Sequence, residues 1–399
     1  MTVSPKKTLH ELNGLRLIAI LMLIYFHYFA LIRYFVPDFS SQGWEFIFNF
    51  ADYGFTGTGL FFILSGFILT YIYWKPGSAQ LRIAPAQFLF LRFSRIYPLH
   101  LLLLFVLLLL SMGNSKVPFT LQQWWVQTAL LQSFFPHQAE AWNFPSWALS
   151  SLLIFYALFP SLVARLSRLS RRQRALLTGL TYLFILSLDA VYLWFNPDSL
   201  RSYNAASQGF YLSIIKFSPI VWLAFFIAGV SAGINFAEIQ SSSRALRGPW
   251  ADGIALALVL IHLAGAHIPY VFLRHGLLLP LQLGLIVCLC RQESRVGAWL
   301  KMPFMRRWGE RSLTMYLLHV PVLYAFVSSP LMNRNRLGVL FVAYSMALFI
   351  LSYYVDRYLV QSIALRLRRF WEQKVNGKAE GKMSLAGNSS SRTSALNKL

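Results

Sequence analysis

Long apolar segments recur along almost the whole chain, and short polar stretches separate them. Most of them hold about 20 residues, the length at which an α-helix crosses the hydrocarbon core of a bilayer. The pattern predicts an all-α, polytopic integral membrane protein with about ten transmembrane helices in one domain, residues 1–371. Prolines and polar residues interrupt the fourth and ninth segments, whose ends are the least defined. The ten segments are about 15–34, 53–73, 94–112, 147–165, 174–194, 217–235, 250–268, 274–291, 312–329 and 337–361.

The composition supports a membrane protein: 57% of the residues are apolar and 13% are charged, whereas an average soluble domain holds about 45–50% and 25%. If the N-terminus is cytoplasmic, seven of the 36 Lys and Arg residues fall on the outer side and 29 (36 − 7) on the cytoplasmic side. This bias follows the positive-inside rule. We therefore expect a multi-pass protein of a bacterial plasma membrane with both termini cytoplasmic. The net charge of +22 then reflects topology and attraction to anionic lipids, and it does not predict nucleic-acid binding.

Four smaller features add little chemistry. The first apolar segment has no small-residue cleavage site after it, so it is expected to be a retained anchor. Cys288 and Cys290 point to different faces of one helix, which predicts neither a disulfide nor a metal site. Residues 372–399 are rich in Ser, Lys and Gly and are expected to form a disordered cytoplasmic tail. The loop at 113–146 contains three tryptophans, which predicts a short interfacial helix.

Two ionisable residues interrupt the first apolar segment. Arg16 and His27 are eleven positions apart, about three helical turns and 16 Å of rise, so they lie on nearly the same helix face. A charge at that depth is costly unless it faces the protein interior or water. Either Arg16 reaches the inner headgroups while His27 makes a structural hydrogen bond, or the pair belongs to a functional site.

Other polar residues recur at helical spacing. Arg92 and Arg95 share a helix face, where they would clamp a phosphate or simply anchor the helix end. His319 follows Tyr316 by three positions and lies on the same face. Three small residues in the second segment are expected to serve helix packing: Gly57, Gly59 and Gly66. The remaining transmembrane histidines are expected to be boundary or packing residues: His100, His262, His267 and His275.

Five stretches resemble one family, the acyltransferase family 3 integral membrane proteins. LNGLRLIA, with Arg16, ten residues and then His27, matches the family's opening Arg-x10-His segment. The family's later segments are matched in the same order, and the five stretches cover about residues 11 to 360. Those later stretches are FFILSGFIL, LRFSRIYPLH, PSWALSSLLIFYALFP and GERSLTMYLLHVPV.

The resemblance implies an enzyme that moves an acyl group, typically acetyl, from a cytoplasmic acyl-CoA donor to a hydroxyl of an extracytoplasmic carbohydrate or lipid-linked sugar. No tightly bound cofactor and no metal are expected. His27 would act either as a general base or as a transient acyl carrier. The implied catalytic residues are His27, Arg16 and His319, and the implied donor-binding residues are Arg92 and Arg95. The implied acceptor-binding or site-lining residues are Ser65, Trp147, Ser150, Tyr156 and Tyr316.

The chain departs from the family pattern where the family often carries membrane carboxylates and other polar groups. Ala148 and Leu152 replace a Ser and a Glu, Gly59 replaces a polar residue, and Trp222 and Phe225 replace an Arg and a Glu. A catalytically degenerate relative is therefore one alternative. A transporter or flippase is another, since intramembrane Arg and His also mark transport pathways, but the two halves show no internal repeat.

Overall fold

The computed structural model of the chain describes residues 9–35, 50–112, 120–204, 207–239, 249–327 and 337–373. These residues are overwhelmingly helical and contain no β-strand beyond an isolated bridge between Trp74 and Leu81. The predicted all-α class is thus confirmed. The tail from residue 374 onward, for which disorder was expected, lies outside the described residues.

The helices follow one another in a simple order along the chain. The α-helices are α1 (His10–Phe35), α3 (Gly57–Tyr73), α4 (Pro85–Met112), α5 (Leu121–Thr128), α6 (Trp147–Leu166), α7 (Arg171–Phe195), α8 (Phe210–Phe217), α9 (Pro219–Ile239), α10 (Trp250–Leu263), α11 (Tyr270–His275), α12 (Leu279–Arg291), α13 (Arg295–Leu300), α14 (Pro303–Glu310), α15 (Ser312–Val327) and α16 (Leu337–Tyr354). Short 3₁₀ turns are η1 (Gly54–Thr56), η2 (Gln132–Phe134), η3 (Pro136–Gln138), η4 (Phe144–Ser146) and η5 (Gly265–His267), and η7 (Val355–Val360) is a π-helical turn.

Eight helical stretches in the described part of the chain are long and apolar enough to cross a membrane, which makes the protein a polytopic membrane protein. The ten predicted spans therefore divide into these eight and two shorter apolar helices, α10 and α15. At 1.5 Å per residue the 14 residues of α10 and the 16 of α15 rise about 21 and 24 Å, less than the roughly 30 Å of a hydrocarbon core. Each borders a stretch outside the described residues. The predicted short helix in the Trp-rich loop is α5.

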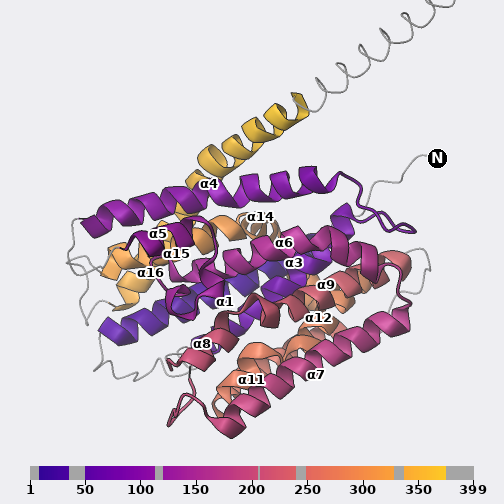
Figure 1. Cartoon of the computed structure of the whole chain (residues 1–399), viewed down its shortest axis with the longest axis horizontal. Helices are drawn as coiled ribbons and strands as arrows, with labels where there is room; N and C mark the ends of the chain where they lie inside the picture. Colours follow the sequence, from indigo (N-terminus) through magenta and orange to yellow (C-terminus); the bar gives the residue numbers. More distant parts are fainter. Residues whose placement is uncertain are drawn as a thin grey trace, which may run out of the picture.

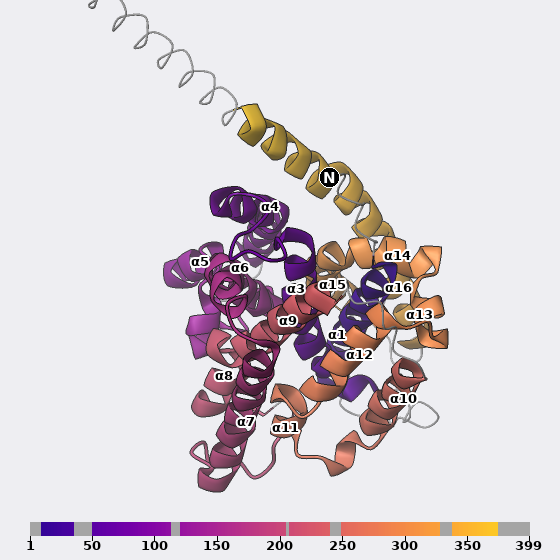
Figure 2. The same ribbon diagram turned by 90° about the vertical axis from the view of Figure 1, so that its right-hand side faces the viewer.

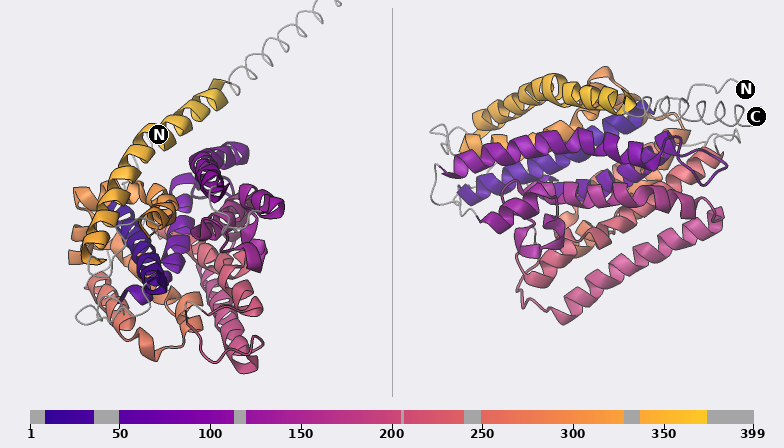
Figure 3. Two further views of the ribbon diagram at one scale, coloured as in Figure 1. Left: turned by 90° about the vertical axis from the view of Figure 1, so that its left-hand side faces the viewer. Right: turned by 45° about the horizontal axis from the view of Figure 1, so that its top comes forward.

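The helices run roughly along one direction, with α1 and α3 inside the bundle and α4 and α7 on opposite sides of it (Figures 1 and 2). The last helical stretch projects away from the other helices at its C-terminal end (Figure 3). α3 is apolar around its circumference and almost wholly buried, as expected for a central membrane helix. α7, by contrast, buries only four of its residues.

Glycines set the close packing of α3 against α9. A Cβ at Gly66 would overlap the carbonyl oxygen of Phe226, and one at Gly229 would overlap that of Ile63. The backbones therefore approach each other more closely than any side chain at these positions allows. Gly57 and Gly59 likewise meet atoms of α1 and α9, so the predicted packing role of the three glycines is confirmed.

Candidate active site

His27 and His319 form a pair between two helices of the bundle. His27 lies on α1 and His319 on α15, and their Nδ1 and Nε2 atoms are 2.9 Å apart. The two imidazole rings are nearly parallel, with centroids 5.1 Å apart. The ring of Phe144 meets His27 edge-on at 4.7 Å, which fixes the plane of the imidazole from the other side.

Donor and acceptor rules assign the tautomers of the pair. Nδ1 of His319 lies 2.5 Å from the carbonyl oxygen of Tyr316, which can only accept, so this Nδ1 carries the proton. In a neutral His319 ring, Nε2 is then a lone pair that accepts from Nδ1–H of His27. The lone pair of His27 is thereby directed to its Nε2. No described residue hydrogen-bonds to this atom, which leaves it available as a base or a nucleophile.

The loop before α6 is tied to the helix that carries His319. The hydroxyl of Tyr316 donates to the carbonyl of Pro145 at 2.6 Å, and the amide of Asn143 donates to the carbonyl of Leu317 at 3.1 Å. Phe144, which contacts His27, lies between these two anchors. The two hydrogen bonds therefore hold the loop against α15, and with it the ring of Phe144 against His27.

His27 lines a cavity of about 520 Å³ at the end of the bundle toward which α1 runs; we call it the His27 cavity. Ligand sites commonly occupy about 300–1,000 Å³, so this volume suits a sugar-sized group. Trp147 also lines this cavity. Charged side chains also line the cavity: Arg33, Asp52, Glu140, Lys216 and Arg274.

A second, much smaller cavity of about 60 Å³ lies near the start of α1; we call it the arginine cavity. Arg16, Arg92 and Arg95 line it, although α1 and α4 supply them from distant parts of the sequence. Arg92 donates to the hydroxyl of Tyr73 at 2.7 Å, and Arg95 donates to the carbonyl of Glu310 at 3.0 Å. The three like charges repel one another and outnumber Glu310, the acidic residue that lines the same cavity, so the cavity attracts an anion.

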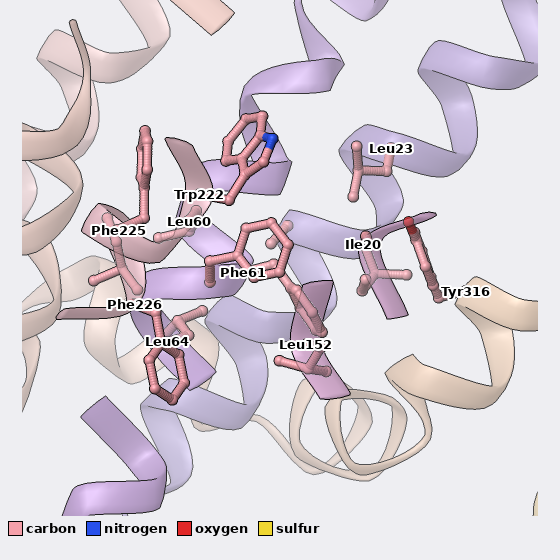
Figure 4. Close-up of a cluster of buried hydrophobic side chains, with 14 of the residues drawn as sticks. Ile20, Leu23, Leu60, Phe61, Leu64, Leu152, Trp222, Phe225, Phe226 and Tyr316 are labelled. Atoms are coloured by element: carbon pink, nitrogen blue, oxygen red, sulfur yellow. The ribbon is translucent and has the colours of Figure 1, made fainter. Parts of the chain in front are cut away.

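Buried apolar side chains lie between the two cavities. Figure 4 shows Ile20, Phe61, Leu152 and Tyr316 in one cluster with Trp222 and Phe225; we call this cluster the apolar layer. Phe61 stacks on Tyr316, with ring centroids 6.2 Å apart. Two of the positions where the family often has carboxylates, Leu152 and Phe225, belong to this layer.

The other predicted site residues divide between the two ends of the bundle. Ser65 and Tyr156 line the arginine cavity. Ser150 lines neither cavity, since its hydroxyl lies 2.6 Å from that of Ser133 and ties α6 to the turn η2. Tyr316 also lines neither cavity, and it acts through the contacts with Pro145 and His319 given above.

Three of the remaining histidines behave as expected. His100 and His262 are buried and lie at hydrogen-bonding distance from backbone carbonyls, and His267 is exposed at the end of η5. His275 is more than a packing residue. Its Nδ1 lies 3.0 Å from Oδ1 of Asp189, and both side chains are fully buried.

Sequence reasoning missed a polar group around the His27 cavity. Asp189, Lys216, Arg274 and His275 are all more than nine-tenths buried, and Lys216 and Arg274 line the cavity. The signal was present, because an Asp within the apolar run 174–194 and an Arg-His pair beside an apolar segment are rare in membrane helices. Their mutual proximity was not visible, since they come from three separate helices.

The fold and the site together define a polytopic membrane protein with a histidine pair on α1 and α15 and a cluster of three arginines nearer the start of α1. Comparison with known protein families identifies the family. The acyltransferase family 3 model, described as "Acyltransferase domain", matches residues 9–357. The chain therefore belongs to this family, as the Arg-x10-His segment predicted.

Among curated proteins, the chain is similar to the "Putative peptidoglycan O-acetyltransferase YrhL" of Bacillus subtilis (strain 168). The two are 22% identical over 333 residues, which is 78% of this chain and 48% of that protein. The chain thus spans about half the length of the relative that it matches. No solved structure matches the chain.

Proposed function

We propose that the protein is a membrane O-acyltransferase in which His27 is the general base for a hydroxyl acceptor bound in the His27 cavity. The observation that carries this proposal is the hydrogen-bond chain from His27 through His319 to the carbonyl of Tyr316. That chain leaves the lone pair on Nε2 of His27 beside a sugar-sized cavity, with no partner among the described residues. Once Nε2 takes a proton, the resulting positive charge is stabilised at Nδ1 by the lone pair of His319.

The donor in this proposal is an acyl-CoA, typically acetyl-CoA, whose phosphates bind at the arginine cavity. Guanidinium groups form two-pronged hydrogen bonds with phosphate oxygens, and three of them face this small space. A cavity of about 60 Å³ accommodates only a small anionic group, so the rest of the donor lies outside it. An extended chain separates the phosphates of acyl-CoA from its thioester, which matches an arginine cluster placed well away from the histidine pair.

The proposed step balances in atoms and charge. The acceptor hydroxyl gives its proton to Nε2 of His27 while its oxygen attacks the thioester carbonyl carbon. The carbon–sulfur bond breaks, and the thiolate leaves and takes the proton back from His27. The products are an O-acyl ester and free CoA, and the histidine regains its starting tautomer.

The proposed acceptor is a hydroxyl of an extracytoplasmic envelope carbohydrate. The name of the Bacillus subtilis relative, which refers to peptidoglycan O-acetylation, supports this class of acceptor. The charge asymmetry between the two ends supports a donor on the cytoplasmic side, cytoplasmic termini and a plasma membrane location. The two cavities lie at different levels along α1, which fits a donor and an acceptor that arrive from opposite sides.

The test is mass spectrometry of envelope glycans from cells that lack the gene and carry wild-type or variant copies. Loss of an acyl mass on deletion, restored by the wild-type copy, is expected. His27→Ala should fail to restore it at normal membrane abundance, whereas His137→Ala, at an exposed histidine away from both cavities, should restore it. Restoration by His27→Ala would contradict the proposal. A second experiment distinguishes a general base from an acyl carrier. The reaction is quenched with acid, the protein is digested, and its peptides are searched for an acyl-histidine, which a general base does not form.

A further inference from the structure

We propose that the His27 cavity recognises an anionic group on the acceptor, a carboxylate or a phosphate, through Arg274 with the help of Lys216. This inference rests on the proposed function, because it names the chemical class of the acceptor that the same cavity takes. The acceptor would then be an acidic or phosphorylated sugar rather than a neutral one.

Among the residues that the structure describes, Arg274 is a buried cation without an anionic partner. Only 8% of its surface is exposed, and its guanidinium lies 5.8–5.9 Å from the ring centroids of Phe55, Phe217 and Trp222. Its Nε is buried without a hydrogen-bond partner, and no acidic side chain of the described residues forms a salt bridge with it. Aromatic faces keep a guanidinium charged, but they do not satisfy its five N–H donors.

The nearby carboxylates are engaged elsewhere or exposed. Asp189 pairs with His275, and Asp52 pairs with Arg33. Glu140 lines the cavity and attracts Lys216, but it is exposed to solvent. The buried wall around Arg274 is therefore positive, and a ligand anion is the partner that it lacks.

Lys216 adds a second buried cation to the same cavity. It is 4% exposed, and its Nζ donates to the carbonyl of Ser207 at 2.6 Å and lies 5.5 Å from the ring centroid of Tyr270. Lys216 and Arg274 come from α8 and α11 and lie within electrostatic range of each other. Two buried like charges that line one cavity are costly in the empty site, and an anion between them would relieve that repulsion.

The backbone around Arg274 is held firmly. Its neighbour His275 is fully buried, and its bond to Asp189 fastens α11 to α7. The ring of His275 also lies 5.7 Å from that of Trp222, which itself packs near the guanidinium. An anion bound at Arg274 would therefore fix one end of the sugar while a hydroxyl reaches Nε2 of His27, so Arg274 would select which hydroxyl is acylated.

The experiment measures equilibrium binding of three probes to the purified full-length protein in detergent: glucose, glucuronate and glucose 1-phosphate. We expect at least one of the two anionic sugars to bind about tenfold more tightly than glucose, in line with a charge-assisted hydrogen bond. The sugar that binds more tightly identifies the group as a carboxylate or a phosphate. Arg274→Gln should remove this preference and leave glucose binding unchanged. Arg274→Lys should retain part of it, and Arg201→Gln, at an exposed arginine outside the cavity, should retain it fully.

Equal binding of all three sugars, or a preference that survives Arg274→Gln, would overturn the inference. If Arg274→Gln does not yield folded protein, Arg274→Lys carries the test, because it keeps the charge but loses the two-pronged contact. His27→Ala separates this inference from the proposed function. It should keep the preference for the anionic sugar, and only its acyl transfer reports on the catalytic proposal.

Discussion

Gly59 on α3 and Phe225 on α9 fill a single space between the two helices. A Cβ at Gly59 would approach Cε1 of Phe225 to 2.7 Å, and the phenyl ring is 2% exposed and packs on Trp222 at 5.1 Å. In the family that this chain belongs to, these two positions often carry a polar residue and a Glu. In this chain the ring of Phe225 fills the space at both positions. The two differences from the family pattern are therefore coupled and not independent of each other.

The pair predicts a stability coupling. Gly59→Ala should lower the free energy of unfolding by about 1–3 kcal/mol, since Phe225 has no room to move away. Adding Phe225→Leu should recover part of that loss, with a coupling of about 0.5–3 kcal/mol between the two changes. Gly179→Ala is the matched control, because nothing lies within 4 Å of that added Cβ, and it should stabilise α7 by about 0.5–1 kcal/mol. Unfolding by SDS in mixed micelles measures these three variants and the Phe225→Leu single variant that completes the cycle. Additive effects at 59 and 225 would contradict the pairing.

The role of His319 can be separated from that of His27. His319→Ala removes the acceptor for Nδ1–H of His27, so transfer should fall, but by less than the roughly 10²–10⁴-fold expected for loss of the base itself in His27→Ala. His319→Gln should retain more activity than His319→Ala, because a side-chain carbonyl can accept the same proton. Initial transfer rates, normalised to membrane abundance, test the order. Equal rates for the Ala and Gln variants would mean that His319 serves packing alone.

Donor binding is expected to depend on the arginine cavity. Arg92→Ala and Arg95→Ala should each weaken binding of acetyl-CoA about tenfold or more, since each removes a charged hydrogen-bond donor. Replacement by Lys should rescue only part of the affinity, because an ammonium cannot make the two-pronged contact. Arg82→Ala is the control: it lies on the same loop-to-α4 stretch but does not line the cavity. Titration calorimetry on the purified protein gives the affinities, and unchanged values for both alanine variants would leave these arginines as topology signals.

Arg16→Ala and His27→Ala should impair different steps, donor binding in the first case and acyl transfer in the second. Arg16 lies in the arginine cavity and His27 about 16 Å further along α1, so the first change should lower both donor affinity and turnover. The second should lower turnover with donor affinity nearly unchanged. A donor-binding assay beside the transfer assay checks the split, and a donor affinity that drops equally in both variants would argue for a single compact site.

The sidedness of the bundle predicts which positions an impermeant thiol reagent reaches in intact cells. In a background with Cys288 and Cys290 replaced by Ser, Arg201→Cys should be labelled and Arg171→Cys should not. Both positions are exposed, so accessibility within the protein does not confound the comparison. Permeabilised cells should label both. Labelling of the Arg171→Cys protein from outside would reverse the proposed topology.

The apolar segments and the ten-residue spacing between Arg16 and His27 could be read from the sequence, because both depend on helix geometry that repeats along the chain. Arg16, Arg92 and Arg95 could each be recognised, and helical periodicity correctly put Arg92 beside Arg95. The contact between His27 and His319 could not be derived, since 292 positions separate them and only the packing of α1 on α15 joins them. The partners of Arg174 could not be derived either. This side chain is 1% exposed and ties the α6–α7 turn to Asn235 and Glu238, which lie 61 and 64 positions further along the chain.

The apolar layer between the two cavities also has an electrical consequence. A histidine open to one aqueous side and a charged donor site open to the other would together offer protons a route across a membrane that must hold a potential. Phe61, Leu152 and Tyr316 interrupt that route with tightly packed side chains, and such a constriction sheds water and with it the hydrogen-bonded wires along which protons move. Leu152 and Phe225 stand where the family often has carboxylates, so the apolar layer of this chain holds even less water. In the proposed mechanism, the layer that separates the acceptor site from the donor site would therefore also keep the membrane insulated.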